Sequence, residues 1–283
     1  MKNAAQIAFE TLHAFYGDLN WWPAKTPYEI IVGAILTQNT AWHNVEKALA
    51  NFGEDFFARS KKTAERFVLD CDLHESNKII HAEQRECETQ KKTAERFVLD
   101  CELHESNNNI PAEQRDCETQ KKTAERFVLD CDIDELKKII RPAGFFNQKA
   151  VYLKAVTNWF AKYNFDVAAV RREPPEKLRR ELLAVKGVGK ETADSILLYA
   201  FGFATFVVDA YTIRLCERLP LDSEKNYDAA KIFFEKNLPR DEKIFNNFHA
   251  LIVINSKNFC RKSKPLCEKC PLEKICAHAK KNR

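Results

Sequence analysis

Glycine is scarce in this chain, with seven residues among 283, whereas alanine, leucine, glutamate and lysine are frequent. Glycine supplies the tight turns that sheet-rich folds need, and the four frequent residues are strong helix formers. The composition argues against a sheet-rich protein and predicts an all-α fold. The chain is long enough for two domains of ordinary size.

A long apolar run is also missing. The N-terminal apolar residues recur instead at helical spacing: Ala5, Ile7, Ala8, Phe9, Leu12 and Phe15. No continuous stretch there can serve as a signal peptide or cross a membrane. We therefore expect a soluble intracellular protein without a membrane partner, in the cytoplasm, or associated with the nucleoid in a prokaryote.

A strong excess of charge of one sign is absent too. The chain has 45 basic and 41 acidic side chains, which gives a formal net charge of +4. This excess is too small to identify a polyanionic partner. Any case for nucleic acid must rest on where the basic residues lie.

Cysteine, in contrast, is plentiful, with ten residues. Half of them belong to an internal repeat, because the string KKTAERFVLDC begins at Lys61, Lys91 and Lys121. The copies covering 61–90 and 91–120 are nearly identical, which indicates a recent duplication more than a solenoid of many units. The repeats are rich in helix formers and predict a long helix over 82–100. The cysteines of the repeats are widely spaced in the sequence. This spacing favours small side chains within helices over metal ligands.

The C-terminal segment CRKSKPLCEKCPLEKIC has cysteines at the spacing C-x6-C-x2-C-x5-C: Cys260, Cys267, Cys270 and Cys276. Clustered thiols in a reducing compartment indicate a metal centre more than disulfides. A [4Fe-4S] cluster and a four-cysteine zinc site are the candidates. A single short pair favours the cluster, since zinc sites more often use two. Exposed lysines and arginines around this loop would suit a phosphate backbone. These basic residues are Lys257, Arg261, Lys262, Lys264, Lys269 and Lys274.

The segment EKLRRELLAVKGVGKETADSILLYAF predicts a helix, a glycine hairpin and a second helix. Pro174 and Pro175 suit the start of the first helix. Gly187 can adopt a positive φ, and Gly189 leaves backbone N–H groups free to bind an anion at the start of the second helix. Lys186 and Lys190 flank this turn. On its own, such a hairpin is also an ordinary helix connection.

Asp209 follows the short apolar run of VVDAYTIRL. It is predicted to cap a helix over 210–218, where the positive helix end favours its ionised form. Capping and catalysis are compatible roles, because a capping side chain is rigidly held.

The hairpin, the Val-Val-Asp and the cysteine loop together resemble the endonuclease III branch of the helix-hairpin-helix DNA glycosylases. The resemblance covers nearly the whole chain except about 61–120. It implies a six-helix barrel domain over 24–203, with the duplicated repeats inserted at 61–120. It also implies an iron-sulfur cluster domain built from 1–23 and 204–283. Between the domains, a cleft would accept a flipped nucleotide from double-stranded DNA, bound by a monomer.

Glu191 departs from the bifunctional members of this family, in which a lysine at that position attacks the sugar. A carboxylate cannot form a Schiff base. Lys190 is adjacent but should point elsewhere, because one helical residue is a turn of about 100°. Excision would then depend on water and Asp209, without a lyase step. Glu191 could alternatively be no more than a favourable acid in the first turn of a helix.

Further matches point to the 3-methyladenine glycosylases of this branch. The resemblance assigns Gln38 and Asn39 to the gap left by the flipped base, and Phe145 to a wedge between bases. It assigns aromatic residues to the base pocket, at positions that match Trp21, Trp22 and Trp42. Capping for Asn39, and core packing for Phe145 and the tryptophans, are the alternatives.

The sequence thus predicts a monofunctional DNA glycosylase of base excision repair that acts on alkylated purines. Two alternatives stay open. One is a glycosylase for another lesion, such as mismatched adenine or thymine, or an oxidised pyrimidine with lyase activity. The other is a non-catalytic iron-sulfur protein that binds DNA.

Overall fold

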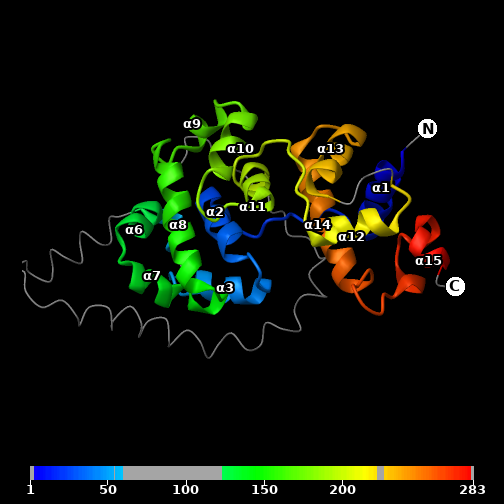
Figure 1. The fold of residues 1–283 in the computed structure, drawn as a ribbon, viewed down its shortest axis with the longest axis horizontal. Helices are drawn as coiled ribbons and strands as arrows, with labels where there is room; N and C mark the ends of the chain where they lie inside the picture. Colours follow the sequence, from blue (N-terminus) through cyan, green and yellow to red (C-terminus); the bar gives the residue numbers. More distant parts are fainter. Residues whose placement is uncertain (1–2, 54, 60–122, 222–225, 282–283) are drawn as a thin grey trace, which may run out of the picture.

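The computed structural model describes residues 3–53, 55–59, 123–221 and 226–281 (Figure 1). Within these ranges every regular element is a helix, which confirms the predicted all-α fold. None of these helices is long and apolar enough to cross a membrane. The repeats at 61–120 and their predicted helix over 82–100 lie outside the described residues.

The first lobe is built around the central helix α2 (Pro27–Leu36). Its sequence PYEIIVGAIL is apolar almost all round, as expected of a helix enclosed by others. Every residue from Ile30 to Leu36 is buried. Helices α3 (Trp42–Ala50), α8 (Phe146–Ala161) and α11 (Lys190–Ser195) pack against α2. The lobe also contains α6 (Ala124–Asp130), α7 (Ile133–Ile139), α9 (Val167–Arg171) and α10 (Pro175–Leu183). Helix α11 continues directly into a π-helical turn, Ile196–Ala200.

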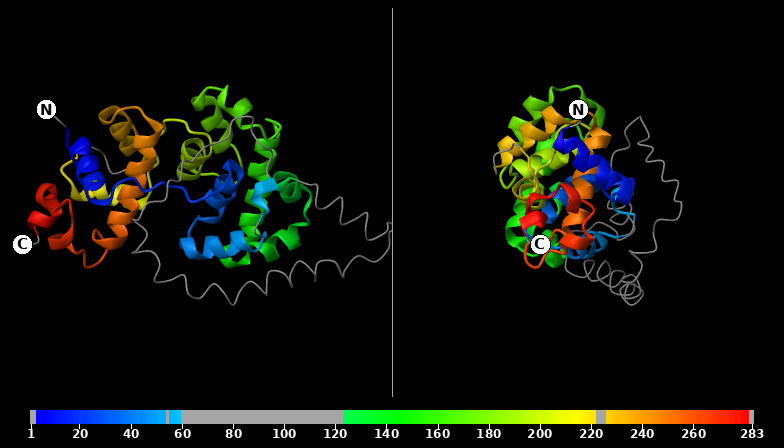
Figure 2. Two further views of the ribbon diagram at one scale, coloured as in Figure 1. Left: turned by 180° about the vertical axis from the view of Figure 1, so that it is seen from behind. Right: turned by 90° about the vertical axis from the view of Figure 1, so that its right-hand side faces the viewer.

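The second lobe contains both ends of the chain, as the views in Figure 2 show. Its helices are α1 (Ala4–Tyr16), α12 (Ala210–Arg218), α13 (Tyr227–Asn237), α14 (Glu242–Asn258) and α15 (Ala277–Lys281). Helix α1 packs along α14. A cluster of phenylalanines, among them Phe206, Phe234 and Phe248, forms the core of the second lobe. The domain boundaries inferred from the sequence stay predictions.

Local sequence signals place several helix ends correctly. Helix α1 starts with a capping box between Asn3 and Gln6. Helix α10 has Pro175 in its first turn, where the missing N–H costs nothing. In α1, the expected apolar stripe is buried at Ala5, Ala8 and Leu12, whereas Ile7 and Phe15 are exposed.

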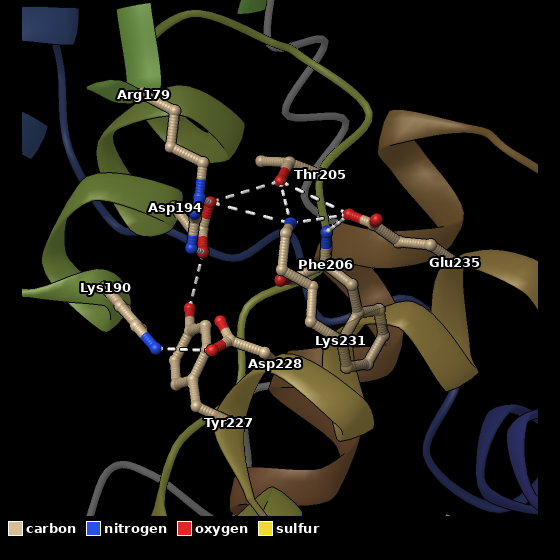
Figure 3. A network of polar contacts seen from close by, with 9 residues as sticks. All are labelled: Arg179, Lys190, Asp194, Thr205, Phe206, Tyr227, Asp228, Lys231 and Glu235. Carbon is tan, nitrogen blue, oxygen red and sulfur yellow. Dashed lines mark hydrogen bonds and ion pairs between the residues drawn. The ribbon is translucent and has the colours of Figure 1, made fainter. Parts of the chain in front are cut away.

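A buried polar network joins the two lobes (Figure 3). Its centre is Asp194 of α11, whose side chain is fully buried. Arg179 of α10 donates to both carboxylate oxygens, at 2.8 and 3.0 Å. From α13, the Tyr227 hydroxyl donates to Oδ2 at 2.7 Å, and Lys231 Nζ lies 3.5 Å from Oδ1. The second glycine-hairpin helix is therefore tied to the second lobe through charge-assisted bonds.

Candidate active site

A cleft of about 1350 Å³ lies between the two lobes and collects most of the residues that the sequence singled out. The predicted site residues that line it are Trp21, Trp22, Gln38, Asn39, Trp42, Phe145, Gly187, Gly189, Lys190, Glu191 and Asp209. Lys186 is exposed on the hairpin but is not part of the lining.

The glycine hairpin forms one wall. Gly187 has φ +84°, and a Cβ added there would lie 2.1 Å from Cγ of Tyr152 on α8. Both the backbone conformation and the aromatic ring behind it therefore require glycine. Gly189 is the N-cap residue of α11. Gln38, which follows α2, fixes the position of the hairpin. Its Nε2 donates to the Gly187 carbonyl at 2.9 Å and to Thr192 Oγ1 at 3.0 Å.

Asp209 caps α12, as its position in the sequence predicts. Its Oδ1 accepts from the Thr212 backbone N–H at 2.7 Å and from the Thr212 hydroxyl at 3.0 Å. The side chain is nearly buried, with 11% exposed. Desolvation opposes ionisation, but His249 and the bonds from Thr212 outweigh it and hold the pKa of Asp209 below its usual value. Asp209 is thus a fixed negative charge on the cleft wall.

Glu191 also lines the cleft, in the first turn of α11, with its side chain open to it. Desolvation by the cleft, followed by repulsion from Asp209, raises the pKa of Glu191 to about 7. Unlike Asp209, Glu191 can exchange a proton near neutral pH.

His249 was missed by the sequence analysis. It lies on α14, buried on an apolar face, and its Nε2 is 3.6 Å from Asp209 Oδ2. Its other ring nitrogen, Nδ1, is 2.6 Å from the hydroxyl of Tyr199, which is also buried. A lone histidine in a helix gives no sign of its partners, because both come from distant parts of the chain.

Two of the three lysines that line the cleft are bound to other residues. Lys190 Nζ pairs with Asp228 of α13 at 2.5 Å and lies 5.9 Å from the centre of the Tyr227 ring. This agrees with the expectation that Lys190 points away from Glu191. Lys149 is buried, and its Nζ donates to the carbonyls of Leu36 and Ala143, both at 2.8 Å. Burial lowers the pKa of Lys149 to about 8. Lys257 is an exposed member of the lining.

The three predicted pocket tryptophans form one cluster. The Trp42 ring centre is 6.0 Å from that of Trp21 and 5.3 Å from that of Trp22. Trp22 is buried against Gly33 and Tyr199, so it belongs to the core as well as to the cleft wall. Trp21 and Trp42 are partly exposed and present ring surface to the cleft.

Two loops project side chains at the cleft rim. Phe145 is 64% exposed, which excludes the alternative that it packs in the core. Asn39, with φ +53°, is exposed after the end of α2 and caps no helix there. Lys149 binds the carbonyls just before both loops, and so fixes their spacing.

The C-terminal cysteines line one small cavity beside α12 and α15: Cys260, Cys267, Cys270 and Cys276. All four are free thiols. Arg218 Nη1 lies 3.2 Å from Cys260 Sγ, where it can offset thiolate charge. Four unpaired thiols around one cavity fit a cluster with four cysteine ligands. Among the described residues, however, no three or more ligand side chains are grouped closely enough to hold a metal ion.

Comparison with known proteins identifies the class. Residues 78–240 match the family described as HhH-GPD superfamily base excision DNA repair protein. A protein of Methanocaldococcus jannaschii, provisionally named a DNA repair glycosylase, is 40% identical over 271 residues, which cover 95% of this chain and 93% of that protein. The chain therefore belongs to the HhH-GPD superfamily and is a base excision DNA glycosylase similar to endonuclease III.

Solved structures agree on the fold. The 3-methyladenine DNA glycosylase of H. pylori is 25% identical, with a TM-score of 0.57, and the match covers 88% of this chain and 97% of that one. A non-covalent endonuclease III–DNA complex is 17% identical, with a TM-score of 0.62, and covers 100% and 99% of the two chains. At that identity the second likeness concerns the fold alone.

Proposed function

We propose that this chain is a monofunctional glycosylase that hydrolyses the glycosidic bond of alkylated purines such as 3-methyladenine. The observation that carries the proposal is the pair Glu191 and Asp209 in a tryptophan-lined cleft, where Lys190, the neighbour of Glu191 in the sequence, is held by Asp228. The similar H. pylori enzyme is named a 3-methyladenine DNA glycosylase and was solved with 1,N6-ethenoadenine bound.

In this mechanism, the damaged nucleotide leaves the duplex and enters the cleft. The glycosidic bond then lengthens, and positive charge develops on the sugar. Asp209, fixed by its cap bonds and ionised, stabilises that charge. Water attacks the sugar, and Glu191 in its ionised form accepts the proton that the water loses. The products are a free base and an intact abasic strand.

The base pocket suits a cationic base. N3-methylation gives adenine a positive charge and a labile glycosidic bond, so excision needs no strong general acid. A cation over a tryptophan face gains about 0.5–2 kcal/mol, depending on desolvation. Trp21 and Trp42 offer such faces on the cleft wall. Neutral purines lack this attraction and should be excised far more slowly.

In this proposal, the site residues outside the base pocket bind the DNA strands. Asn39 and Phe145 enter the duplex where the nucleotide has left, and Gln38 braces the hairpin beneath them. The hairpin backbone at Gly187 and Gly189, flanked by Lys186 and Lys190, binds phosphate. The exposed basic residues around the cysteine loop extend this contact, and one copy of the chain suffices.

We further propose that Cys260, Cys267, Cys270 and Cys276 hold a [4Fe-4S] cluster, which serves structure and not the reaction because its cavity is separate from the cleft. Protein purified without oxygen should be yellow-brown and contain about four irons per chain. Stoichiometric zinc in protein made with ample iron would contradict this assignment.

A panel of duplexes with single defined lesions tests the activity, each assayed with and without alkali. We expect release of 3-methyladenine, strand breaks only after alkali, and no adduct trapped by borohydride. Preferential removal of mismatched adenine or thymine would replace the proposed substrate. Trapping that disappears in Lys190→Ala would show that this lysine has become the nucleophile.

Replacing Trp42 tests the pocket. Trp42→Ala should slow excision of 3-methyladenine roughly tenfold, equivalent to about 1.4 kcal/mol. Its affinity for undamaged duplex should not change. Equal excision rates of the variant and the wild type would show that Trp42 does not belong to the base pocket.

A further inference from the structure

We infer that His249, oriented by Tyr199, is a positioning residue that presents an N–H group to Asp209 and keeps this carboxylate ionised and aimed into the cleft. This inference rests on the proposed function, since it assumes that Asp209 acts on the sugar. It adds a role for α14, a helix that no sequence motif connected with the reaction.

The first evidence is the burial of the imidazole. His249 has 7% of its surface exposed, and its Nε2 has no hydrogen-bond partner among the described residues. Buried polar groups normally have partners. The Nε2 atom faces Asp209 Oδ2 at 3.6 Å, slightly beyond hydrogen-bond length. A small shift of α14 against the start of α12 would complete this bond.

Tyr199 decides which nitrogen of the neutral ring carries the proton. Its hydroxyl lies 2.6 Å from Nδ1. If the hydroxyl donates to Nδ1, the ring proton is on Nε2 and points at the carboxylate. The opposite tautomer would set the Nε2 lone pair against the negative charge of Asp209. The arrangement therefore favours the sequence Tyr199 O–H to Nδ1, then Nε2–H to Asp209.

The other groups around Asp209 supply no donor to its Oδ2 that could replace the Nε2–H of His249. Glu191 of α11 faces both Asp209 and His249 and repels the Asp209 carboxylate when it is ionised. The Tyr199 hydroxyl, on the π-helical turn, is neutral, since burial raises its pKa. The Thr212 groups bond to Oδ1, so Oδ2 depends on His249. Lys257, also on α14, lines the same cleft but is exposed.

Two substitutions at this position separate chemistry from packing. His249→Gln can place an amide N–H near the position of Nε2, whereas His249→Leu fills the space without a donor. The Leu variant should lose excision by about 30-fold, as expected for removal of a bond to a buried charge. The Gln variant should recover most of the rate, and both variants should still bind DNA.

The tautomer is measured independently of the reaction. Nitrogen-15 NMR of histidine-labelled protein, with His249→Gln to assign the signal, should show the proton on Nε2. Tyr199→Phe should weaken this preference.

A neutral ring protonated at Nδ1 would overturn the inference, and so would a Gln variant as slow as the Leu variant. Undiminished excision by Asp209→Asn would instead refute the proposed role of Asp209, whatever the tautomer of His249.

Discussion

Asp209 and Glu191 are both carboxylates in one cleft, yet their surroundings move their pKa values in opposite directions. Asp209 is enclosed by donors from α12 and by His249. No hydrogen-bond donor of this kind is found for Glu191 among the described residues, and the negative charge of Asp209 repels its carboxylate. Two acids with separated pKa values can divide the work: one stays charged, and the other transfers a proton.

Asp209→Asn tests the charged role. Asparagine caps helices about as well as aspartate, so the melting temperature should hardly change. Excision should fall by roughly 10²- to 10³-fold, the usual effect of removing one preorganised electrostatic contact. The control is Asp241→Asn, the same change at the N-cap of α14. Excision rates, melting and DNA affinity would be compared, and an equal loss of excision in both variants would contradict the role.

Glu191→Gln tests the proton-transferring role through stability. The native state binds the Glu191 proton more tightly than the unfolded chain, so the free energy of unfolding falls as pH rises from about 4.5 through about 7. Glutamine removes this dependence. The variant should melt roughly 1–3 °C above the wild type at pH 8 and close to it at pH 4, since solvent exposure limits the effect. Glu217→Gln, on the exposed face of α12, is the control, and a gain at both pH values would contradict the pKa of Glu191.

At the level of elements, local signals account for what the sequence predicted. The start of α10 at Pro175, the turn at Gly187 and the cap at Asp209 each depend on a few neighbouring residues. His249 and Lys149 could not be found in this way. The partners of His249 lie at the start of α12 and on the π-helical turn, and those of Lys149 lie at the end of α2 and before α8. Only the packing of helices brings these groups together.

The hairpin provides a matched pair of glycine substitutions. Gly187→Ala must strain a positive φ and displace the Tyr152 ring, whereas Gly53→Ala strains a φ of +96° in open space. The strained backbone alone should lower the free energy of unfolding of each variant by about 1–2 kcal/mol. Gly187→Ala should in addition reduce affinity for duplex DNA by roughly tenfold, or about 1.4 kcal/mol. Fluorescence anisotropy with a labelled duplex measures this, and equal affinities of the two variants would show that the hairpin does not bind DNA.

At the level of the whole molecule, the cleft exists because two lobes are held at a fixed spacing. Asp209 and His249 belong to the second lobe, and Glu191 and the tryptophan at position 42 belong to the first. The network around Asp194 is therefore a condition of the site, and two of its members, Lys190 and Tyr227, also line the cleft. No sequence motif indicates this network, since its members come from α10, α11, α13 and the segment before α12.

The network of Figure 3 contains a buried and an exposed aspartate, which allows its contribution to be measured. Asp194→Ala leaves Arg179 and Lys231 without their shared carboxylate in a poorly hydrated place, where Lys231 is 12% exposed. We expect a loss of about 3 kcal/mol in the free energy of unfolding. Asp228→Ala removes only the exposed pair with Lys190, in which Asp228 is 55% exposed, and should cost less than about 0.5 kcal/mol.

Urea unfolding of both variants measures these costs, and excision at a temperature where each stays folded reports on the cleft. Asp194→Ala should then excise more slowly than its folded fraction explains, because the hairpin helix carrying Glu191 is no longer tied to the lobe carrying Asp209. Asp228→Ala should excise as the wild type does. If folded Asp194→Ala excises at the full rate, the spacing of the lobes is set by the packing of the π-helical turn against α14 instead, and the network serves stability alone.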